Sequence, residues 1–246
     1  MPDSRTGAAS PPAPAVVAPG EVNAAMKANA LAVLERLQAG RQHDATPSET
    51  SLAIAAGREA ALQTRLLTAG VPARYREAHW DNVRVPEAHE WKAGVLLEPN
   101  LRRGKGLLIT GPVGTGKSSV AALICREAAT ETNDRGPRTV RWEYFPSMLD
   151  ELEDRKERRK VEARQTAPAL LVWDDFLTET LAAWQPPLLD RIVEMRYRAR
   201  KSTIITTNIE PRIIAQDPAL ERIASRWQQS NKVLVVAGRD RRAGEQ

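Results

Sequence analysis

The residues best suited to chemistry stand in the stretch GPVGTGKSSV, residues 111–120. Its spacing, G-x-x-x-x-G-K-S, follows a short apolar run and precedes a helical pattern, which is the context that a phosphate-binding P-loop requires. Glycines let the backbone turn its N–H groups toward phosphate oxygens, and the positive end of the helix adds to the attraction. The predicted nucleotide-binding residues are Gly111, Pro112, Val113, Gly114, Thr115, Gly116, Lys117, Ser118 and Ser119.

Two side chains of this stretch have separate predicted tasks. The ammonium group of Lys117 can reach the β- and γ-phosphates of a nucleotide. The hydroxyl group of Ser118 can complete the coordination shell of a Mg²⁺ ion that keeps several waters. The motif therefore predicts binding of a nucleoside triphosphate together with Mg²⁺.

Paired carboxylates follow a second apolar run, ALLVWDD, residues 169–175. A buried parallel strand that ends here puts Asp174 at the carboxyl edge of a sheet, beside the P-loop. Asp174 is predicted to hold Mg²⁺ through its water shell, together with Ser118. Asp175 is predicted to orient or deprotonate an attacking water, which favours hydrolysis. The alternative for Asp175 is that it only caps the next segment.

Three further polar residues complete the candidate catalytic set. Asn208 ends the apolar run STIITTN and can position the attacking water and sense the γ-phosphate, or it can be an ordinary turn residue. Arg222 and Arg226 are four residues apart, so they share one face of a short helix. One of them can act as an arginine finger across a subunit interface, where it would neutralise charge on the γ-phosphate. The alternative is a surface ion pair.

The elements that position these residues are predicted from short apolar runs that alternate with helical patterns. Near-continuous apolar runs between helices are typical of strands buried on both faces of a parallel sheet. The predicted class is therefore α/β, with roughly five strands and helices on both faces. The runs are GLLITG (106–111), TVRWEYF (139–145), ALLVWDD (169–175), STIITTN (202–208) and KVLVVAG (232–238).

The chain before this domain has a different composition. Residues 1–20 are rich in proline and alanine and are predicted to be disordered. Residues 21–69 are predicted to form a helical, partner-binding region with one helix from residue 21 and a second from Ser51 to Ala69, ended by Gly70. Such helices either pack on the main domain or await a partner. The main domain is expected at residues 70–242, followed by a tail at 243–246.

Overall composition limits the possible classes. Hydrophobic residues are 42% and charged residues 27% of the chain, which is typical of a soluble globular protein. The one cysteine, Cys125, excludes an internal disulfide or a cysteine-rich zinc site and is expected in the core. The absence of a long apolar run or a secretory signal predicts a cytoplasmic protein without a membrane segment. The net charge of +5 is compatible with nucleic-acid binding.

As a set, these motifs resemble the AAA+ ATPases of the DnaC/IstB group, which are helicase loaders and transposition helpers. The resemblance covers about residues 70–242 and rests on four features. They are the Asp-Asp pair, the lead-in GVPARYREAHWDNVRV (70–85), the segment ERIASRW (221–227), and an ending in GRDRR without a helical lid. Members commonly have a glycine shortly after Asp-Asp, where this chain has Phe176 and Leu177.

The resemblance implies several properties that spacing alone does not give. The P-loop NTPase sheet would have the strand order 5-1-4-3-2, and the nucleotide would be ATP. Arg226 would be the finger, supplied in trans by a neighbouring copy in a homo-oligomer formed with ATP and a partner. In the mixed-charge segment 148–165, Arg155, Arg158 and Arg159 would line a pore and contact single-stranded DNA. The alternative for that segment is a solvated helix with internal ion pairs.

Three functions follow from this resemblance. The leading hypothesis is an ATPase that helps to load a replicative helicase onto single-stranded DNA. The second is a transposition helper, whose partner is a transposase. The third is a nucleotide-gated adaptor that binds ATP and hardly hydrolyses it. A small-molecule kinase is disfavoured, because the Asp-Asp pair and the finger helix would then have no role.

Overall fold

The structure is a computed structural model of the chain. It describes residues 49–83, 85, 86, 88, 103–130, 132, 133, 136–177, 180–238 and 240. The predicted disordered segment 1–20, the predicted helix that begins at residue 21 and the predicted tail 243–246 lie outside these residues. The chain divides into two compact units, Met1–Ile54 and Ala55–Gln246, and every described strand lies in the second.

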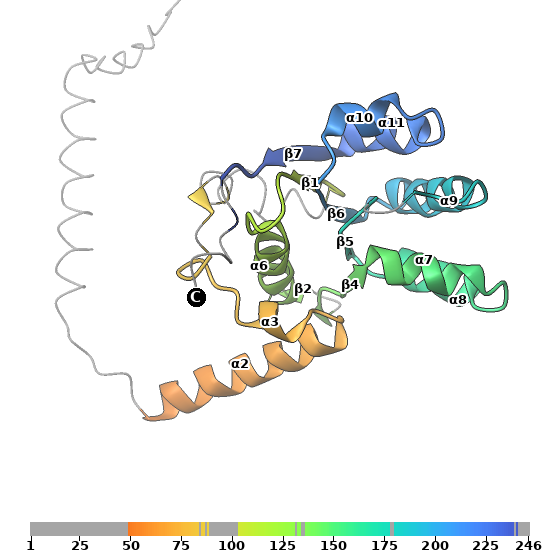
Figure 1. The fold of residues 1–246 in the computed structure, drawn as a ribbon. Coiled ribbons are helices and arrows are strands. Elements are labelled where there is room, and N and C mark those ends of the chain that lie inside the picture. Colours follow the sequence, from red (N-terminus) through yellow and green to blue (C-terminus); the bar gives the residue numbers. More distant parts are fainter. Residues whose placement is uncertain are drawn as a thin grey trace, which may run out of the picture. The chain divides into compact units, whose positions relative to one another are not determined.

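A five-stranded parallel sheet forms the centre of this unit, with the strand order β4-β5-β6-β1-β7 (Figure 1). Each strand lies at one of the five apolar runs. Numbered one to five along the chain, these strands have the order 5-1-4-3-2 from β7 to β4, so the predicted fold class and strand order are confirmed. Every residue of β1, β5 and β6 is buried, which explains why those runs lack polar alternation. The strands are β1 (Gly106–Thr110), β4 (Val140–Tyr144), β5 (Leu170–Asp174), β6 (Ser202–Thr207) and β7 (Asn231–Val235).

Helices cover both faces of the sheet (Figure 1). One face carries α2 (Glu49–Thr68), α3 (Ala73–Arg76) and α6 (Lys117–Thr130). The other carries α7 (Phe145–Glu153), α8 (Arg158–Thr166), α9 (Gln185–Arg198), α10 (Pro211–Gln216) and α11 (Glu221–Ser230). A short antiparallel pair, β2 (Thr132–Asn133) and β3 (Gly136–Pro137), follows α6. Within the described residues, every helix is too short or too polar to cross a lipid bilayer.

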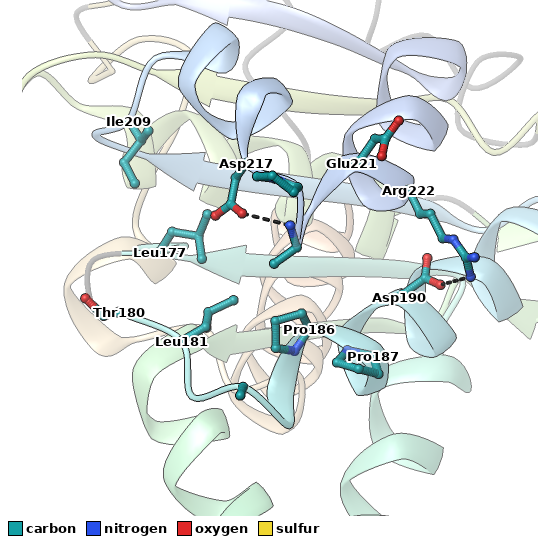
Figure 2. A pocket seen from close by; sticks show the side chains of 13 residues that line it. Leu177, Thr180, Leu181, Pro186, Pro187, Asp190, Ile209, Asp217, Glu221 and Arg222 are labelled. Atoms are coloured by element: carbon teal, nitrogen blue, oxygen red, sulfur yellow. Dashed lines mark hydrogen bonds and ion pairs between the residues drawn. The ribbon is translucent and has the colours of Figure 1, made fainter.

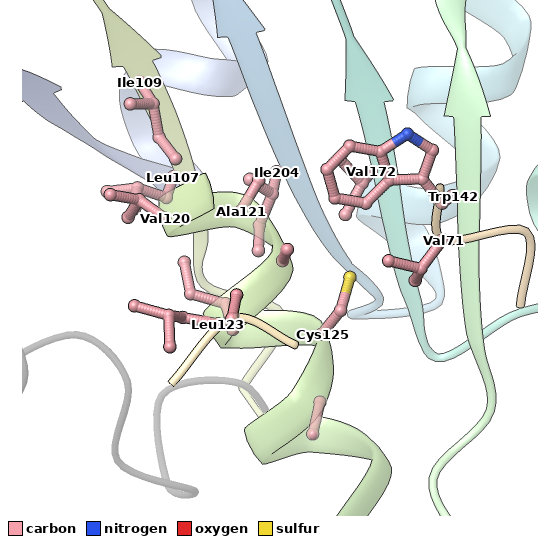
Figure 3. Close-up of a cluster of buried hydrophobic side chains, with 14 of the residues drawn as sticks. Val71, Leu107, Ile109, Val120, Ala121, Leu123, Cys125, Trp142, Val172 and Ile204 are labelled. Atoms are coloured by element: carbon pink, nitrogen blue, oxygen red, sulfur yellow. The ribbon is translucent and has the colours of Figure 1, made fainter. Parts of the chain in front are cut away.

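The alternation of side chains along the strands divides the interior into two cores. Ile204 of β6 faces the core under α6, whereas Ile205 faces the core under α9 and α11. Figure 3 shows the first core, where Val172 and Ile204 meet the apolar side of α6. Cys125 lies in this core with 0% exposure, as predicted, and burial raises the pKa of its thiol.

The region after α2 ties this helix to the sheet. Gly70 takes a positive φ of 84°, and its N–H donates to the carbonyl of Leu67 while that of Val71 donates to Leu66, which is a Schellman ending. The carbonyl of Ala69 then accepts a hydrogen bond of 2.7 Å from the N–H of Trp142 on β4. The predicted helix 51–69 thus packs on the main domain, which is one of the two alternatives that its sequence allowed.

An aromatic cluster fills the second core beside the site. Trp173 on β5 stacks on Phe176 with ring centroids 5.9 Å apart and an interplanar angle of 2°. Phe145 meets Trp173 edge-on at 5.4 Å, and Trp227 meets Phe176 at 5.0 Å. The indole N–H of Trp173 donates to Gln165 Oε1 at 2.9 Å, so this large side chain has both its apolar and its polar requirements met.

The mixed-charge segment 148–165 forms two helices, which corrects the expectation of one, and it contains the expected internal ion pairs, Glu157 with Lys160 and Glu151 with Arg164. It divides into α7 and α8 at residues 154–157, where Asp154 has an extended backbone and its carboxylate accepts a hydrogen bond from the N–H of Lys156. A short acidic side chain that bonds the backbone two residues on competes with helix formation. Leu152 and Val161 are fully buried, so the segment contributes to the second core.

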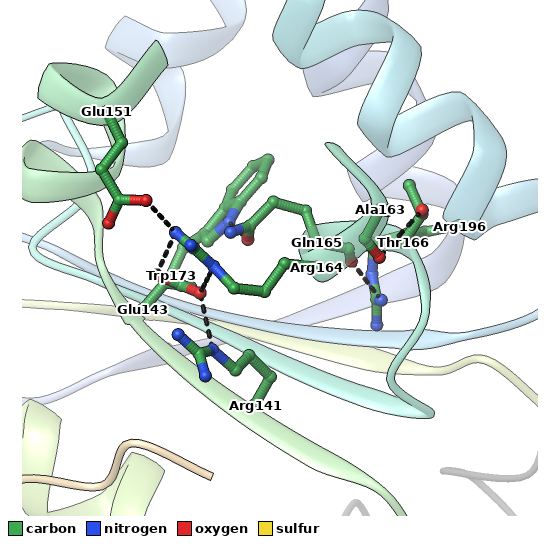
Figure 4. A network of polar contacts seen from close by, with 9 residues as sticks. All are labelled: Arg141, Glu143, Glu151, Ala163, Arg164, Gln165, Thr166, Trp173 and Arg196. Atoms are coloured by element: carbon green, nitrogen blue, oxygen red, sulfur yellow. Dashed lines mark hydrogen bonds and ion pairs between the residues drawn. The ribbon is translucent and has the colours of Figure 1, made fainter. Parts of the chain in front are cut away.

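Buried charged side chains make polar contacts on the same face of the sheet (Figure 4). Arg196 of α9 is 1% exposed, and its guanidinium donates to the hydroxyl of Thr203 and to the carbonyls of Gln165, Pro168 and Ser202. These acceptors lie at the ends where β5 and β6 begin. Burial lowers the pKa of Arg196 to about 9.

A second charged group joins the edge strand β4 to the helices beside it. Glu143 is 6% exposed and accepts hydrogen bonds from Arg141 at 2.6 Å and from Arg164 at 2.7 Å. Arg164 also reaches Glu151 on α7 at 2.7 Å, which links α7, α8 and β4 (Figure 4).

Candidate active site

The predicted loop connects β1 to α6 at the carboxyl edge of the sheet. Gly114 and Gly116 have positive φ values of 77° and 99°, a backbone conformation that side chains disfavour. A Cβ atom at Gly116 would also lie 2.9 Å from a methyl group of Val85, so that position has no room for a side chain. The strand, the glycine-bearing loop and the helix N-terminus therefore form the cradle that the sequence predicted.

Lys117 lies across this loop. Its ammonium group donates to the carbonyls of Gly111 at 2.9 Å and Pro112 at 2.7 Å, and the residue is 6% exposed. The hydroxyl of Thr115, which is fully buried, donates to the same Pro112 carbonyl at 2.9 Å. These contacts hold a positive charge inside the loop, where an anionic ligand would be attracted to it.

The remaining predicted loop residues lie at its tip and at the helix start. Val113 is 57% exposed at the tip, next to the exposed Pro112. Ser119 is half-buried in the first turn of α6. These positions surround the cradle without closing it.

Ser118 and Asp174 meet at the edge of the sheet, as predicted. The Ser118 hydroxyl donates to Asp174 Oδ1 at 2.8 Å, and the Thr206 hydroxyl donates to the same oxygen at 2.6 Å. Asp174 is 4% exposed. Burial raises its pKa and outweighs these two hydrogen bonds, which lower it, while the negative charge of Asp175 raises it further.

This donor set fits Mg²⁺. A carboxylate and a hydroxyl are hard oxygen ligands, and the ion usually takes only one or two such protein groups beside waters and substrate phosphates. The raised pKa of Asp174 means that its negative charge is poorly compensated by the protein, and a divalent cation would compensate it.

The chain turns sharply after β5, at Asp175. Asp175 and Leu177 both have a positive φ of 59°, a conformation that glycine adopts without strain. The chain makes this turn with residues that carry side chains. The N–H of Asp175 donates to the Thr206 hydroxyl at 3.0 Å, and the N–H of Phe176 donates to the Thr206 carbonyl at 2.8 Å.

Asn208 is exposed and directly follows β6, the strand that lies between β1 and β5. In the register of the sheet, Thr207 pairs with Thr110 of β1. The residues that follow them, Asn208 and Gly111, therefore leave adjacent strands at the same edge of the sheet. The structure thus gathers Asn208, the Asp pair and the P-loop at this edge.

The two candidate finger arginines lie elsewhere. They belong to α11, which packs on the opposite face of the sheet from α6. Arg226 donates through Nη1 to Asp190 Oδ1 at 2.7 Å and through Nε to Glu194, and its side chain is 23% exposed. Arg222 is 81% exposed and lies 3.9 Å from Asp190.

A cavity of about 950 Å³ lies beside Arg222 (Figure 2). The loop after β5 contributes Leu177 and Leu181, and the start of α9 contributes Pro186 and Asp190. The first turn of α11 contributes Arg222, whose ion pair with Asp190 is drawn in Figure 2. The cavity therefore connects the turn after Asp175 with the face that carries the candidate fingers.

The three arginines predicted to contact DNA have different surroundings. Arg155 is exposed in the turn between α7 and α8, and Arg159 is exposed in the first turn of α8. Arg158 lies 4.1 Å from the ring centroid of Trp184, and its Nε donates to the carbonyl of Leu152 at 2.8 Å. The structure therefore gives Arg158 partners within the chain, whereas Arg155 and Arg159 are exposed at the surface.

Sequence reasoning missed three residues of this region. Thr206 contacts both aspartates, and nothing in the sequence separates it from Ser202, Thr203 and Thr207 of the same strand. Asp190 and Glu194 hold Arg226, and their four-residue spacing on α9 matches that of Arg222 and Arg226 on α11. That matched spacing could have suggested the contact once the two helices were known to be neighbours.

Comparisons with known proteins agree with this geometry. No model of a known protein family matches the chain. It is 24% identical over 178 residues to "AAA ATPase forming ring-shaped complexes" of Kocuria rhizophila, which covers 67% of this chain. The chain spans only 27% of the length of that relative.

Solved structures give the wider agreement. A DnaC helicase loader is similar with a TM-score of 0.56 and 26% identity, over 68% of this chain and 100% of that one. A putative primosome component from Streptococcus pyogenes serotype M3 has a TM-score of 0.56 and 18% identity, over 74% and 98% of the two chains. AMPPCP-bound DnaA from Aquifex aeolicus has a TM-score of 0.54 and 19% identity, over 68% and 51%.

The strand order and the loop between β1 and α6 define a P-loop NTPase fold of the AAA+ type. Within that class, the resemblance to the DnaC group of helicase loaders, inferred from the motifs, is confirmed by the similarity to the DnaC helicase loader.

Proposed function

We propose that the chain is an ATPase that hydrolyses ATP to ADP and phosphate and that this cycle helps to load a replicative helicase onto single-stranded DNA. The observation that carries the ATPase proposal is the 2.8 Å hydrogen bond from Ser118 to Asp174. It joins the first turn of the P-loop helix to the carboxylate at the end of β5, which is where a nucleotide-bound Mg²⁺ ion would lie.

ATP binds in the cradle between β1 and α6. The backbone N–H groups of the loop and the N-terminus of α6 face the phosphates, and Lys117 moves from its two carbonyl acceptors to the β- and γ-phosphates. The similar DnaA structure is bound to AMPPCP, which supports nucleotide binding by this fold.

Ser118 and Asp174 would hold the Mg²⁺ ion that accompanies ATP. When bound, the ion neutralises negative charge on the β- and γ-phosphate oxygens. The Thr206 hydroxyl keeps its hydrogen bond to Asp174 and so fixes the orientation of this carboxylate.

Asp175 and Asn208 act on the attacking water. Asp175 accepts a hydrogen bond from the water and takes its proton as the oxygen attacks the γ-phosphorus. The bond between the γ-phosphorus and the bridging oxygen breaks, and the electron pair stays on ADP. Asn208 orients the same water from the neighbouring strand, because both residues leave the carboxyl edge of the sheet.

Arg226 completes the site of a neighbouring copy. It lies on the face of the sheet opposite α6, which favours action in trans over action in its own site. Asp190 and Glu194 fix the orientation of its guanidinium group, and its side chain is 23% exposed. A finger that is held in place by neighbours loses less conformational entropy when it meets the γ-phosphate.

Similarity to a DnaC helicase loader favours the helicase as partner over the transposase of the second hypothesis. Exposed Arg155 and Arg159 are the proposed contacts to single-stranded DNA, and the assembly is a head-to-tail homo-oligomer formed with ATP and the partner.

The test of this role uses the purified chain with a replicative helicase and circular single-stranded DNA. Co-sedimentation of helicase with the circle should increase when the chain and ATP are added, and Lys117→Ala should abolish the increase. Retention of a transposase but not a helicase would replace the role with that of a transposition helper. ATP binding without turnover, with or without DNA, would favour the nucleotide-gated adaptor.

A further inference from the structure

Thr206 contacts three successive residues at the end of β5. Its hydroxyl donates to Asp174 Oδ1 at 2.6 Å and accepts a hydrogen bond from the N–H of Asp175 at 3.0 Å. Its carbonyl accepts a further hydrogen bond of 2.8 Å from the N–H of Phe176. The residue is 0% exposed, so water does not compete for these contacts.

These contacts have a defined direction. A threonine hydroxyl has a single hydrogen, and the ionised Asp174 carboxylate can only accept it. The lone pairs of the hydroxyl are then available to the N–H of Asp175. The ionised carboxylate of Asp174 thus fixes the direction in which the Thr206 hydroxyl points. The hydroxyl in turn fixes the orientation of the peptide group between Asp174 and Asp175.

Asp175 needs such support. Its φ of 59° lies in the left-handed region, which residues other than glycine adopt uncommonly. Backbone strain of this kind persists only where the surroundings hold it. The two hydrogen bonds from this turn to Thr206 provide that support.

We propose that Thr206 is a positioning residue for ATP hydrolysis, whose hydroxyl fixes the backbone of Asp175 and thereby aims the Asp175 carboxylate at the attacking water. This inference rests on the proposed function, since it assumes that Asp175 acts on water. Thr206 itself touches neither substrate nor water.

The same strand offers a matched control. Thr203 is also buried, at 7% exposure, and its hydroxyl accepts a hydrogen bond of 2.9 Å from the Nε of Arg196. It lies near the start of β6, away from the aspartates. Thr203→Val and Thr206→Val each remove one buried hydroxyl with little change in volume, so the pair separates loss of stability from loss of positioning.

The experiment measures kcat and KM for ATP, the calorimetric dissociation constant of Mg·ATP, and the melting temperature for Thr206→Val, Thr206→Ser and Thr203→Val. We expect Thr206→Val to lose roughly 10²-fold in kcat, the size typical of a misplaced catalytic group, with Mg·ATP affinity within about threefold of wild type. Thr206→Ser should recover most of kcat, because it restores the hydroxyl. Thr203→Val should lower the melting temperature while kcat stays near wild type.

Three outcomes would overturn the inference. Equal kcat losses in Thr206→Val and Thr203→Val would make Thr206 an ordinary structural residue. A loss of Mg·ATP affinity as large as the loss of kcat would place its effect on Asp174 instead of Asp175. A wild-type chain that binds ATP and does not hydrolyse it would overturn the ATPase proposal and this inference together.

An independent observation concerns the segment after β7. The carbonyl of Val236 lies against Gly111, where an added Cβ atom would come within 2.1 Å of it. The Asp240 carboxylate lies over Gly114, where an added Cβ atom would come within 1.9 Å of Oδ1. Gly111 and Gly114 of the cradle are thus in close contact with the segment that follows β7, and the group over Gly114 is a carboxylate.

We infer that Asp240 occupies part of the phosphate cradle and that ATP must displace it. A carboxylate and a phosphate are both attracted by the loop N–H groups and Lys117, and the two cannot share the same space. Where such a segment covers the site for a fraction of the time, the apparent affinity for ATP falls in proportion to the uncovered fraction.

Calorimetric titration with ATP tests this without any measurement of turnover. Asp240→Ala should bind ATP roughly 3- to 10-fold more tightly than wild type, as expected if the cradle is covered most of the time. Asp150→Ala, which removes one exposed acidic residue of α7 on the other face of the sheet, should bind like wild type. Equal affinities of wild type and Asp240→Ala would overturn the inference, and so would equal gains in the two variants.

Discussion

Arg226 of α11 and Asp190 of α9 are joined by a hydrogen bond of 2.7 Å, and Glu194 holds the other edge of the same guanidinium group. The arginine is therefore oriented before any neighbour arrives. Arg222, one turn earlier, is 81% exposed and lies 3.9 Å from Asp190. The two candidate fingers thus differ in how firmly they are positioned, which allows a direct choice between them.

We expect mixed oligomers to reveal the finger. Arg226→Ala and Lys117→Ala should each be inactive, because losing a finger typically costs ~10³-fold or more in turnover. Mixed in equal amounts, the two variants can pair an intact P-loop with an intact Arg226 and regain part of the ATPase activity. Arg222→Ala is the control and should keep most of its turnover. No recovery at any mixing ratio, with assembly confirmed by sedimentation, would leave Arg226 as a structural ion pair.

Binding to single-stranded DNA should depend on the turn between α7 and α8. Each phosphate contact releases roughly 0.7 counterions on a single strand, so affinity should fall steeply with salt. Arg155→Ala and Arg159→Ala should each weaken ATP-dependent DNA binding and reduce that slope. The matched control is Arg212→Ala, which removes an equal charge from a side chain that is 75% exposed and paired with Glu210. A flat dependence on salt would contradict the DNA interface.

Asp174 should lower the stability of the fold. Because burial raises its pKa, the folded chain binds a proton at this group more readily than the unfolded chain does. Stability contributed by the protonated form is therefore lost as the pH rises through the folded pKa, and the cost of the buried charge is present at pH values above it.

Asp174→Asn removes that cost and keeps an oxygen acceptor for Ser118 and Thr206. In the absence of Mg²⁺, its melting temperature near pH 7 should exceed that of wild type, and the difference should shrink as the pH is lowered through the folded pKa of Asp174. A lower melting temperature for Asp174→Asn near pH 7 would show that the charged hydrogen bonds outweigh the burial.

Arg196 should be essential to the fold. Arg196→Ala would leave three carbonyls and the Thr203 hydroxyl without this donor in the second core, and we expect a loss of about 3 kcal/mol or more in the free energy of unfolding. Arg198→Ala is the control, because that side chain is 78% exposed and should change stability by less than about 0.5 kcal/mol. Urea denaturation measures both. If Arg196→Ala and Arg198→Ala both lose only a small free energy of unfolding, water has replaced the missing guanidinium donors of Arg196.

The parts of the site that lie within one stretch of chain could be predicted from the sequence. The P-loop follows from the spacing between Gly111 and Ser118, and Asp174 follows from its place at the end of an apolar run. The five strands followed for a similar reason, since buried parallel strands are marked by their composition. Local patterns were enough for these features because each depends on a single element and its ends.

The parts that depend on contacts between elements could not be predicted. Thr206 reaches the aspartates only because β6 lies beside β5, and the sequence does not show which of the three threonines of β6 makes that contact. The contact between Arg226 and Asp190 needs the packing of α11 on α9. The division of 148–165 into two helices depends on the local bond of the Asp154 side chain, which competed with an otherwise helical pattern.

The central claim, that this site hydrolyses ATP through Asp175, is tested most directly by Asp175→Asn. Asparagine tolerates the positive φ of 59° at this position, so the variant should fold and keep the turn after β5. Measured side by side, it should bind Mg·ATP with near wild-type affinity in titration calorimetry and hydrolyse it at least ~10²-fold more slowly. Lys117→Ala, by contrast, should lose binding itself. Hydrolysis by Asp175→Asn at the wild-type rate would contradict the assignment of Asp175 as the residue that activates water.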